Sequence, residues 1–317
     1  MRFVRVPVAF LMFALSVSIC VGAASASPSD HVATSSQLAD AVKSSISIST
    51  TSASVKDTLQ LFAHASSFQL TGPSTFGSCD PYNSAALALS PKPCSFGDLH
   101  GTETIVLVGD SNVGNWIPAL NLGLANTPYR LAVFGFSGCG LPNLTYTANW
   151  GSLYRRCRQW HANVPAAIRA LHPVAVLAAS GAVGTNYPTT TWINGVKNVF
   201  VESTMGAPST RRILLGTSPL LPQSAATCLT VRRNPQDCSL HYMPGSGYYG
   251  SILSRDVQIA ETAGATLVNT SHLFCYKNTC SPIIANTLVY SDFDHVTIAY
   301  SSLISRVLTN AVLSALK

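Results

Sequence analysis

One serine of the sequence directly follows a short apolar run, in the segment Gly109-Asp110-Ser111-Asn112. The run at 104–109 is typical of a buried strand, and the residues after it predict a helix over 113–125. We therefore expect Ser111 at the carboxyl end of a strand and at a helix N-terminus, where free N–H groups and the helix dipole stabilise developing negative charge. This position suits a nucleophile, although serine is also a common helix N-cap without a chemical role.

A second group of chemically capable residues lies near the C-terminus, in the segment Tyr290-Ser291-Asp292-Phe293-Asp294-His295. The spacing of Asp292 and His295 allows the carboxylate, on a turn that enters a helix, to accept a hydrogen bond from the imidazole. That bond would fix the tautomer and support the imidazolium that forms when histidine takes a proton from serine. Asp292 or Asp294 could instead cap a helix, and His295 could be a surface residue. Both groups follow predicted strands, so together they predict a Ser–His–Asp site.

The elements that would position these residues alternate regularly from Glu103 onward. Short apolar runs are separated by longer amphipathic stretches; the runs are 104–109, 130–136, 174–179, 211–216 and 266–269, and the stretches are 113–125, 153–171, 192–201, 246–263 and 296–316. Strands that are almost continuously apolar, with helices between them, are typical of a parallel sheet covered on both faces. We expect a flavodoxin-like, three-layer α/β/α sandwich with about five parallel strands and right-handed crossovers, and with its site at the carboxyl ends of the strands.

The cysteines indicate an oxidising compartment. Apart from Cys20, they fall as close pairs along the chain: Cys79 and Cys94, Cys139 and Cys157, Cys228 and Cys238, Cys275 and Cys280. Four disulfides between sequence neighbours are favoured because short loops are the easiest to close, although other connectivities remain possible. The sequence has no Cys-x-x-Cys, so we expect no metal site.

The N-terminal residues 1–26 have the features of an export signal. Arg2 and Arg5 precede an apolar run over 6–24, and Ala24-Ser25-Ala26 is a small-x-small site of the kind that signal peptidases accept. An uncleaved membrane anchor is the alternative, because the run approaches the roughly 20 residues that span a bilayer. Residues 27–78 are rich in Ser, Thr and Ala, and their apolar residues at helical spacing predict a tether with one or two short helices.

The composition excludes several classes of protein. Hydrophobic residues make up 47% of the 317 residues and charged residues only 10%, whereas charged residues make up about 25% of an average soluble domain. A disordered chain and a long coiled coil are therefore excluded. The net charge is +6, but the basic residues are scattered and form no stripe that would neutralise phosphates, so we expect no nucleic-acid partner.

The two motifs resemble those of the SGNH (GDSL-like) hydrolases, in particular the exported SGNH domains that occur fused to, or beside, membrane acyltransferases of the acyltransferase-3 type. Gly109-Asp110-Ser111-Asn112 is similar to the family's Gly-Asp-Ser-His block, and Asp292 with His295 is similar to its Asp-x-x-His block. Further matches are the segment 116–120, Cys139 with Cys157 ahead of Trp160, and Cys275 to Cys280 before Asp292. The resemblance covers 79–317, which we expect to form the catalytic domain.

This resemblance implies roles for individual residues. Ser111 would be the nucleophile, His295 the base and Asp292 the acid that orients it, and the N–H groups of Ser111 and Gly138 would bind the oxyanion. The family's Gly-x-Asn-Asp block is missing after the run at 174–179, where the sequence reads Ser180-Gly181-Ala182-Val183-Gly184-Thr185-Asn186. The third oxyanion donor is therefore unassigned; the candidates are Asn112, Ser180 and Asn186, each of which could instead be a loop or capping residue.

The resemblance implies an exported or secreted serine esterase that forms an acyl-serine and needs no cofactor. Its substrates would be small O-acyl esters, in particular acetyl esters, of carbohydrate or cell-envelope glycan. One alternative is an O-acyltransferase component that works with a separate membrane acyltransferase partner. A second alternative, which the missing block favours and the three retained side chains oppose, is a non-catalytic relative that binds glycan or an envelope partner.

Overall fold

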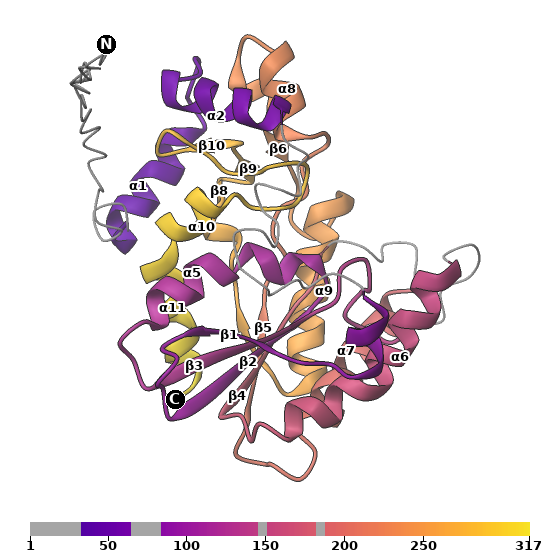
Figure 1. Ribbon diagram of the computed structural model, residues 1–317. Helices are drawn as coiled ribbons and strands as arrows, with labels where there is room; N and C mark the ends of the chain where they lie inside the picture. Colours follow the sequence, from indigo (N-terminus) through magenta and orange to yellow (C-terminus); the bar gives the residue numbers. More distant parts are fainter. Residues whose placement is uncertain (1–32, 65–83, 145–150, 182–187) are drawn as a thin grey trace, which may run out of the picture. The chain divides into compact units, whose positions relative to one another are not determined.

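A six-stranded sheet forms the centre of this computed structural model, which describes residues 33–64, 84–144, 151–181 and 188–317 (Figure 1). The strand order is β1 (Cys94–Gly97), β3 (Tyr129–Gly135), β2 (Glu103–Gly109), β4 (Ala175–Ala179), β5 (Arg211–Leu215) and β7 (Thr266–Val268). The five strands from β3 to β7 are parallel, and β1 pairs with β3 in the antiparallel sense at one edge. The parallel strands are those that the sequence predicts, in the flavodoxin-like order.

Successive side chains of each strand enter two different cores, one on each face of the sheet. On β2, Ile105 and Leu107 join one core, and Val106 and Val108 join the other. The first core is covered by α5 (Ile117–Leu124), α10 (Ile298–Leu303) and α11 (Ser305–Ala315), and the second by α6 (Gly151–Arg169), α7 (Thr189–Ser203) and α9 (Gly247–Ala263). Burial on both faces explains the continuous apolar runs, and the expected three-layer sandwich is confirmed.

The C-terminal helical stretch differs from its prediction as one helix over 296–316. Thr297 caps α10: its hydroxyl accepts a hydrogen bond from the N–H of Tyr300 at 3.1 Å and donates to the carbonyl of Leu288. The helix is interrupted at Ile304, and α11 begins at Ser305. Ile304 is itself buried, so the apolar periodicity continues across the break and does not mark it.

Two helices precede the sheet, as the sequence predicts: α1 (Ser35–Ser45) and α2 (Ala53–His64). Their buried residues Leu38, Val42, Val55 and Leu59 belong to the same core as α5 and α11. Gln236 donates hydrogen bonds to the carbonyls at the end of α1, Ser45 at 2.8 Å and Ile48 at 3.1 Å. These helices therefore contribute to the core of the 31–317 unit; the domain boundary near residue 79 stays a prediction.

The loops around the sheet carry short elements that the sequence pattern does not predict. Helix α4 (Ala85–Leu89) precedes β1, and the excursion between β5 and β7 carries α8 (Ala225–Val231), η4 (Pro235–Cys238) and β6 (Leu240–His241). A second excursion, after β7, carries η5 (Ser271–Leu273), β8 (Cys275–Tyr276), β9 (Thr279–Cys280), β10 (Ile283–Ile284) and β11 (Thr287–Leu288). Each is too short for a period of hydrophobic residues to emerge.

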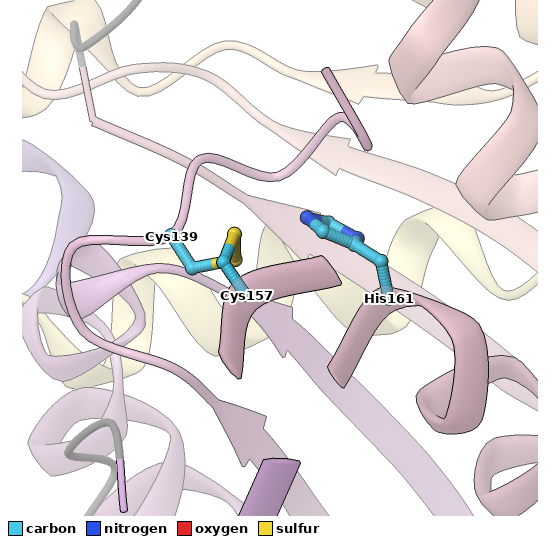
Figure 2. A group of neighbouring side chains, drawn as sticks. All are labelled: Cys139, Cys157 and His161. Carbon is cyan, nitrogen blue, oxygen red and sulfur yellow. A yellow bond between two sulfur atoms is a disulfide. The ribbon is translucent and has the colours of Figure 1, made fainter. Parts of the chain in front are cut away.

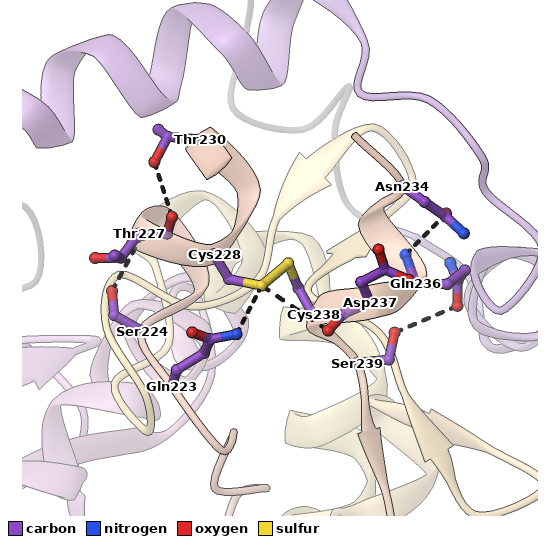
Figure 3. The surroundings of a disulfide bond; sticks show 10 residues. All are labelled: Gln223, Ser224, Thr227, Cys228, Thr230, Asn234, Gln236, Asp237, Cys238 and Ser239. Carbon is purple, nitrogen blue, oxygen red and sulfur yellow. Dashed lines mark hydrogen bonds between the residues drawn. A yellow bond between two sulfur atoms is a disulfide. The ribbon is translucent and has the colours of Figure 1, made fainter. Parts of the chain in front are cut away.

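Disulfides tie these excursions together. Cys228–Cys238 joins α8 to η4, where Gln223 lies against the sulfur of Cys228 (Figure 3). Cys275–Cys280 joins β8 to β9, and Cys139–Cys157 joins the loop after β3 to α6. The fourth expected pair includes Cys79, which lies outside the described residues, as do residues 1–26. In the described ranges, no helix has the length and apolar character needed to span a bilayer.

Candidate active site

The first motif forms a tight turn at the carboxyl end of β2. β2 ends at Gly109, where a Cβ atom would lie 1.7 Å from the carbonyl oxygen of Ala179 on β4, so only glycine allows the two strands to come this close. The chain then enters the 3-10 helix η3 (Ser111–Asn115), and the α-helix that the sequence predicts over 113–125 follows as α5, which begins at Ile117. Ser111 therefore lies at the carboxyl ends of β2 and β4, the neighbouring strands at which the strand order changes direction and where such folds bind ligands.

Asp110 fixes the conformation of this turn. Its carboxylate accepts hydrogen bonds from the N–H of Asn112 at 2.8 Å, from the N–H of Gly181 at 2.9 Å and from the hydroxyl of Ser180 at 2.7 Å. The side chain is buried, and burial raises the pKa of Asp110 although these hydrogen bonds oppose the increase. The turn after β2 is thus bonded to the end of β4.

The structure brings Ser111, His295 and Asp292 into one chain of hydrogen bonds. The Nε2 atom of His295 lies 2.9 Å from the hydroxyl of Ser111, and its Nδ1 atom lies 2.7 Å from a carboxylate oxygen of Asp292. The other carboxylate oxygen of Asp292 accepts the N–H groups of Asp294 at 2.9 Å and His295 at 2.8 Å, which fixes the loop between β11 and α10. The side chain of Asp292 is 19% exposed and that of His295 is 17% exposed, so a ligand can reach these residues.

The charges around the imidazole favour its protonated form. Burial alone would lower the pKa of His295, but the hydrogen bond to Asp292 and the charges of Asp294, Asp292 and Asp110 outweigh it and raise the pKa to about 9. Burial likewise opposes ionisation of Asp292, yet the hydrogen bond and charge of His295 outweigh it and lower the pKa of this carboxylate. The imidazolium of His295 is therefore stabilised, and the neutral ring is a strong base towards the serine.

Asn115 joins the two motifs, although it is not among the candidate residues that the sequence indicates. Its side-chain oxygen accepts the N–H of Val296 at 2.8 Å, and its amide nitrogen donates to the carbonyl of Asp294 at 3.0 Å and to the side chain of Asn112 at 2.9 Å. The same nitrogen lies 3.1 Å from the hydroxyl of Ser218, in the loop after β5. No sequence signal separates this asparagine from an ordinary helix residue.

Two of the candidate oxyanion donors have backbone N–H groups free for a ligand. Within the described ranges, neither Ser111 nor Gly138 donates its N–H to another residue; Gly138 has a φ of +72°, which favours glycine. Of the other candidates, Asn112 is buried with its amide directed to Asp294 at 3.4 Å, and Ser180 donates its hydroxyl to Asp110. Asn186 lies outside the described residues.

The loop that carries Gly138 is held against α6 at two points. Cys139 is bonded to Cys157, and the Nε2 atom of His161 lies 3.0 Å from the carbonyl oxygen of Gly140 (Figure 2). Burial lowers the pKa of His161 to about 4, so the neutral ring donates from Nε2 at physiological pH. The three side chains are close enough to hold a metal ion together, but in this structure both sulfur atoms belong to the disulfide.

Asp292, Asp294 and His295 are a second group close enough to hold a metal ion together. Here the two ring nitrogens of His295 are already paired, one with Asp292 and the other with Ser111. The sequence also allows Asp294 to cap the following helix, but in the structure Thr297 is the N-cap of α10.

A flavodoxin-like sandwich with serine, histidine and aspartate side chains gathered at the carboxyl ends of its strands defines the class of the SGNH/GDSL hydrolase fold. The family described as "SGNH domain (fused to AT3 domains)" matches residues 78–310, and the chain belongs to this family.

Several solved structures are similar to this chain at low sequence identity. The periplasmic domain of a lipopolysaccharide acetyltransferase from Salmonella ser. Paratyphi A is 15% identical, with a TM-score of 0.51 over 68% of this chain and 85% of that one. An aryl esterase from M. smegmatis is 13% identical, with a TM-score of 0.45 over 68% of this chain and 100% of its own. Est24, a carbohydrate acetylesterase from Sinorhizobium meliloti, is 13% identical, with a TM-score of 0.45 over 67% of this chain and 99% of its own. No curated protein matched this chain.

Proposed function

We propose that the protein is an extracytoplasmic serine esterase that removes small acyl groups, in particular acetyl, from hydroxyls of carbohydrate or cell-envelope glycan. The observation that carries the proposal is the unbroken chain of hydrogen bonds from Ser111 through His295 to Asp292. Membership of a family of SGNH domains fused to AT3 domains supports acyl chemistry. The disulfides support an oxidising compartment.

The distances between Ser111, His295 and Asp292 support the following reaction. His295 removes the proton of Ser111 through Nε2 while the serine oxygen attacks the ester carbonyl, and Asp292 stabilises the imidazolium through Nδ1. The N–H groups of Ser111 and Gly138 bind the oxyanion. His295 then returns the proton to the departing alkoxide, which leaves an acyl-serine; water, activated by the same histidine, releases the acid and restores the serine.

A second candidate function is transfer of the acyl group to another hydroxyl. The family description, an SGNH domain fused to AT3 domains, favours it specifically. In that case a sugar hydroxyl replaces water in the second half of the reaction, and a separate membrane acyltransferase supplies the acyl group.

A fluorophosphonate probe, which reacts with activated serines, tests the shared first step. We expect the wild-type protein and the Ser152→Ala control, which changes an exposed serine of α6, to be labelled, and Ser111→Ala to remain unlabelled. A folded wild-type protein that does not react would refute the proposal and favour a binding function.

The release of acetate from a short-chain ester, with and without a sugar acceptor, separates the two candidate functions. Free acetate that forms faster than acetylated sugar, even when the acceptor is present, supports the esterase. An acetylated sugar that forms faster than free acetate would make the transferase the function.

A further inference from the structure

A second carboxylate, Asp294, lies beside the imidazole of His295. One of its oxygens is 3.2 Å from Nδ1, the same nitrogen that Asp292 approaches to 2.7 Å. A neutral imidazole with its proton on Nδ1 has a single N–H at this position, and the shorter distance assigns it to Asp292. The contact with Asp294 is therefore one of charge, without a shared proton.

Apart from His295, the surroundings of Asp294 compensate its charge very little. The residue is 4% exposed, and the oxygen nearest to His295 is buried without a hydrogen bond. The other oxygen accepts one long hydrogen bond, 3.4 Å from the amide of Asn112. An unpaired carboxylate oxygen in such a place is costly, which means that the imidazolium of His295 is the group best placed to stabilise it.

Among the residues that the structure describes, few titratable groups face Asp294. Asp292 and His295 come from its own loop, and Asp110 comes from the turn after β2; the neutral Asn112 also faces it. Within the described ranges, neither lysine nor arginine forms an ion pair with it. Burial first, and then the charges of Asp292 and Asp110, raise the pKa of Asp294 to about 6, against the opposing effects of His295 and Asn112.

We propose that Asp294 is a positioning residue that acts through His295, its carboxylate serving as a second negative charge that sets how strongly the imidazole holds a proton. This proposal rests on the proposed function, because it assigns the base of that reaction. An ionised Asp294 makes His295 a stronger base towards Ser111. It also keeps more of the free enzyme protonated, and therefore inactive, near neutral pH.

The sign of the pH effect follows from this arrangement. Only enzyme with a neutral His295 can accept the serine proton, so kcat/KM falls as the pH drops below the pKa of this histidine. Loss of the Asp294 charge destabilises the imidazolium and lowers that pKa. The acid limb of the kcat/KM profile must then move to lower pH.

The pH dependence of kcat/KM with a short-chain ester tests this proposal. We expect Asp294→Asn to shift the acid limb down by about one pH unit or more, the size of effect typical of a charge at this distance, and to lower the alkaline plateau because the base is weaker. Glu103→Gln is the matched control, since it removes one carboxylate at the exposed far end of β2, and we expect its limb to stay in place. An unchanged limb in folded Asp294→Asn overturns the proposal.

The pKa of His295 can also be measured directly, without turnover, so that the proposal is testable even if the variant is inactive. In the Ser111→Ala background, the His295 imidazole is titrated by NMR with and without Asp294→Asn, and Asp294→Ser serves as a second variant if the first does not fold. A lower histidine pKa in the variant supports the proposal, and an equal pKa refutes it. The two proposals fail separately: a folded wild-type protein that the probe does not label removes the proposed function, whereas a labelled wild-type protein whose histidine pKa and acid limb do not change in Asp294→Asn loses only this inference.

Discussion

The hydrogen bond between His295 and Asp292 decides which nitrogen of the imidazole faces the serine. Because Nδ1 donates its hydrogen bond to Asp292 at 2.7 Å, Nε2 is unprotonated, and its lone pair faces the hydroxyl of Ser111 at 2.9 Å. Asp294 also lies close to Nδ1 but forms no hydrogen bond there. The two neighbouring aspartates therefore differ in kind: Asp292 orients the ring, and Asp294 acts on its charge.

Asp292→Asn should preserve the fold and lower kcat by roughly 10³- to 10⁴-fold, since an asparagine amide permits the wrong imidazole tautomer. The measurement is steady-state hydrolysis of a short-chain ester, with thermal unfolding to verify that the variant is folded. A kcat equal to that of the wild type would remove Asp292 from the proposed site.

At the scale of elements, the loop after β3 depends on α6 for its position. Gly138 adjoins Cys139, which is bonded to Cys157 of α6, and the neighbouring Gly140 accepts a hydrogen bond from His161 of the same helix. Helix α6 itself is fixed by the burial of Trp160, whose ring lies 5.6 Å from that of Phe136 at the end of β3. The N–H of Gly138 is thus placed by contacts with a helix on one face of the sheet.

A double substitution, Cys139→Ser with Cys157→Ser, should lower kcat as well as stability. Loss of a disulfide costs about 2–4 kcal/mol, and displacement of Gly138, the proposed second oxyanion donor, would cost up to about 10²- to 10³-fold in kcat. Cys228→Ser with Cys238→Ser is the control: it removes a disulfide from the excursion around α8, so stability should fall while kcat is retained. Equal kcat values for the two double variants would show that the first disulfide does not position the loop.

The same scale shows which elements a sequence can predict. Each bound of the five parallel strands agrees with its predicted run to within one residue, because burial on both faces leaves a continuous apolar signature. β1 has only partly buried or exposed residues, and β6 and β8 to β11 have two residues each. Tertiary pairing rather than local pattern forms these strands.

At the scale of the whole 31–317 unit, the N-terminal helices contribute to the main core. Leu59 of α2 is 5% exposed and belongs to the core that α5 and α11 cover, whereas Leu61 of the same helix is 62% exposed. Leu59→Ala should lower the free energy of unfolding by about 2–5 kcal/mol, the usual cost of a cavity in a core, and Leu61→Ala should change it little. Denaturant unfolding of both variants measures this; an unchanged midpoint for Leu59→Ala would mean that α2 does not stabilise the domain.

The sequence by itself determined the strands, the layers and the two motifs, because each depends on residues close together in the chain. The spacing of Asp292 and His295 already predicts their hydrogen bond, and the apolar run before Ser111 predicts its place at a strand end. Ser111 and His295 are 184 positions apart, and only the tertiary structure decided that the serine hydroxyl lies 2.9 Å from Nε2 of the histidine. It also decided that Asn115 bonds the two motifs and that Asp294 is buried against the imidazole. Burial and long-range contacts depend on the packing of elements that are distant in the chain, and local sequence patterns do not predict that packing.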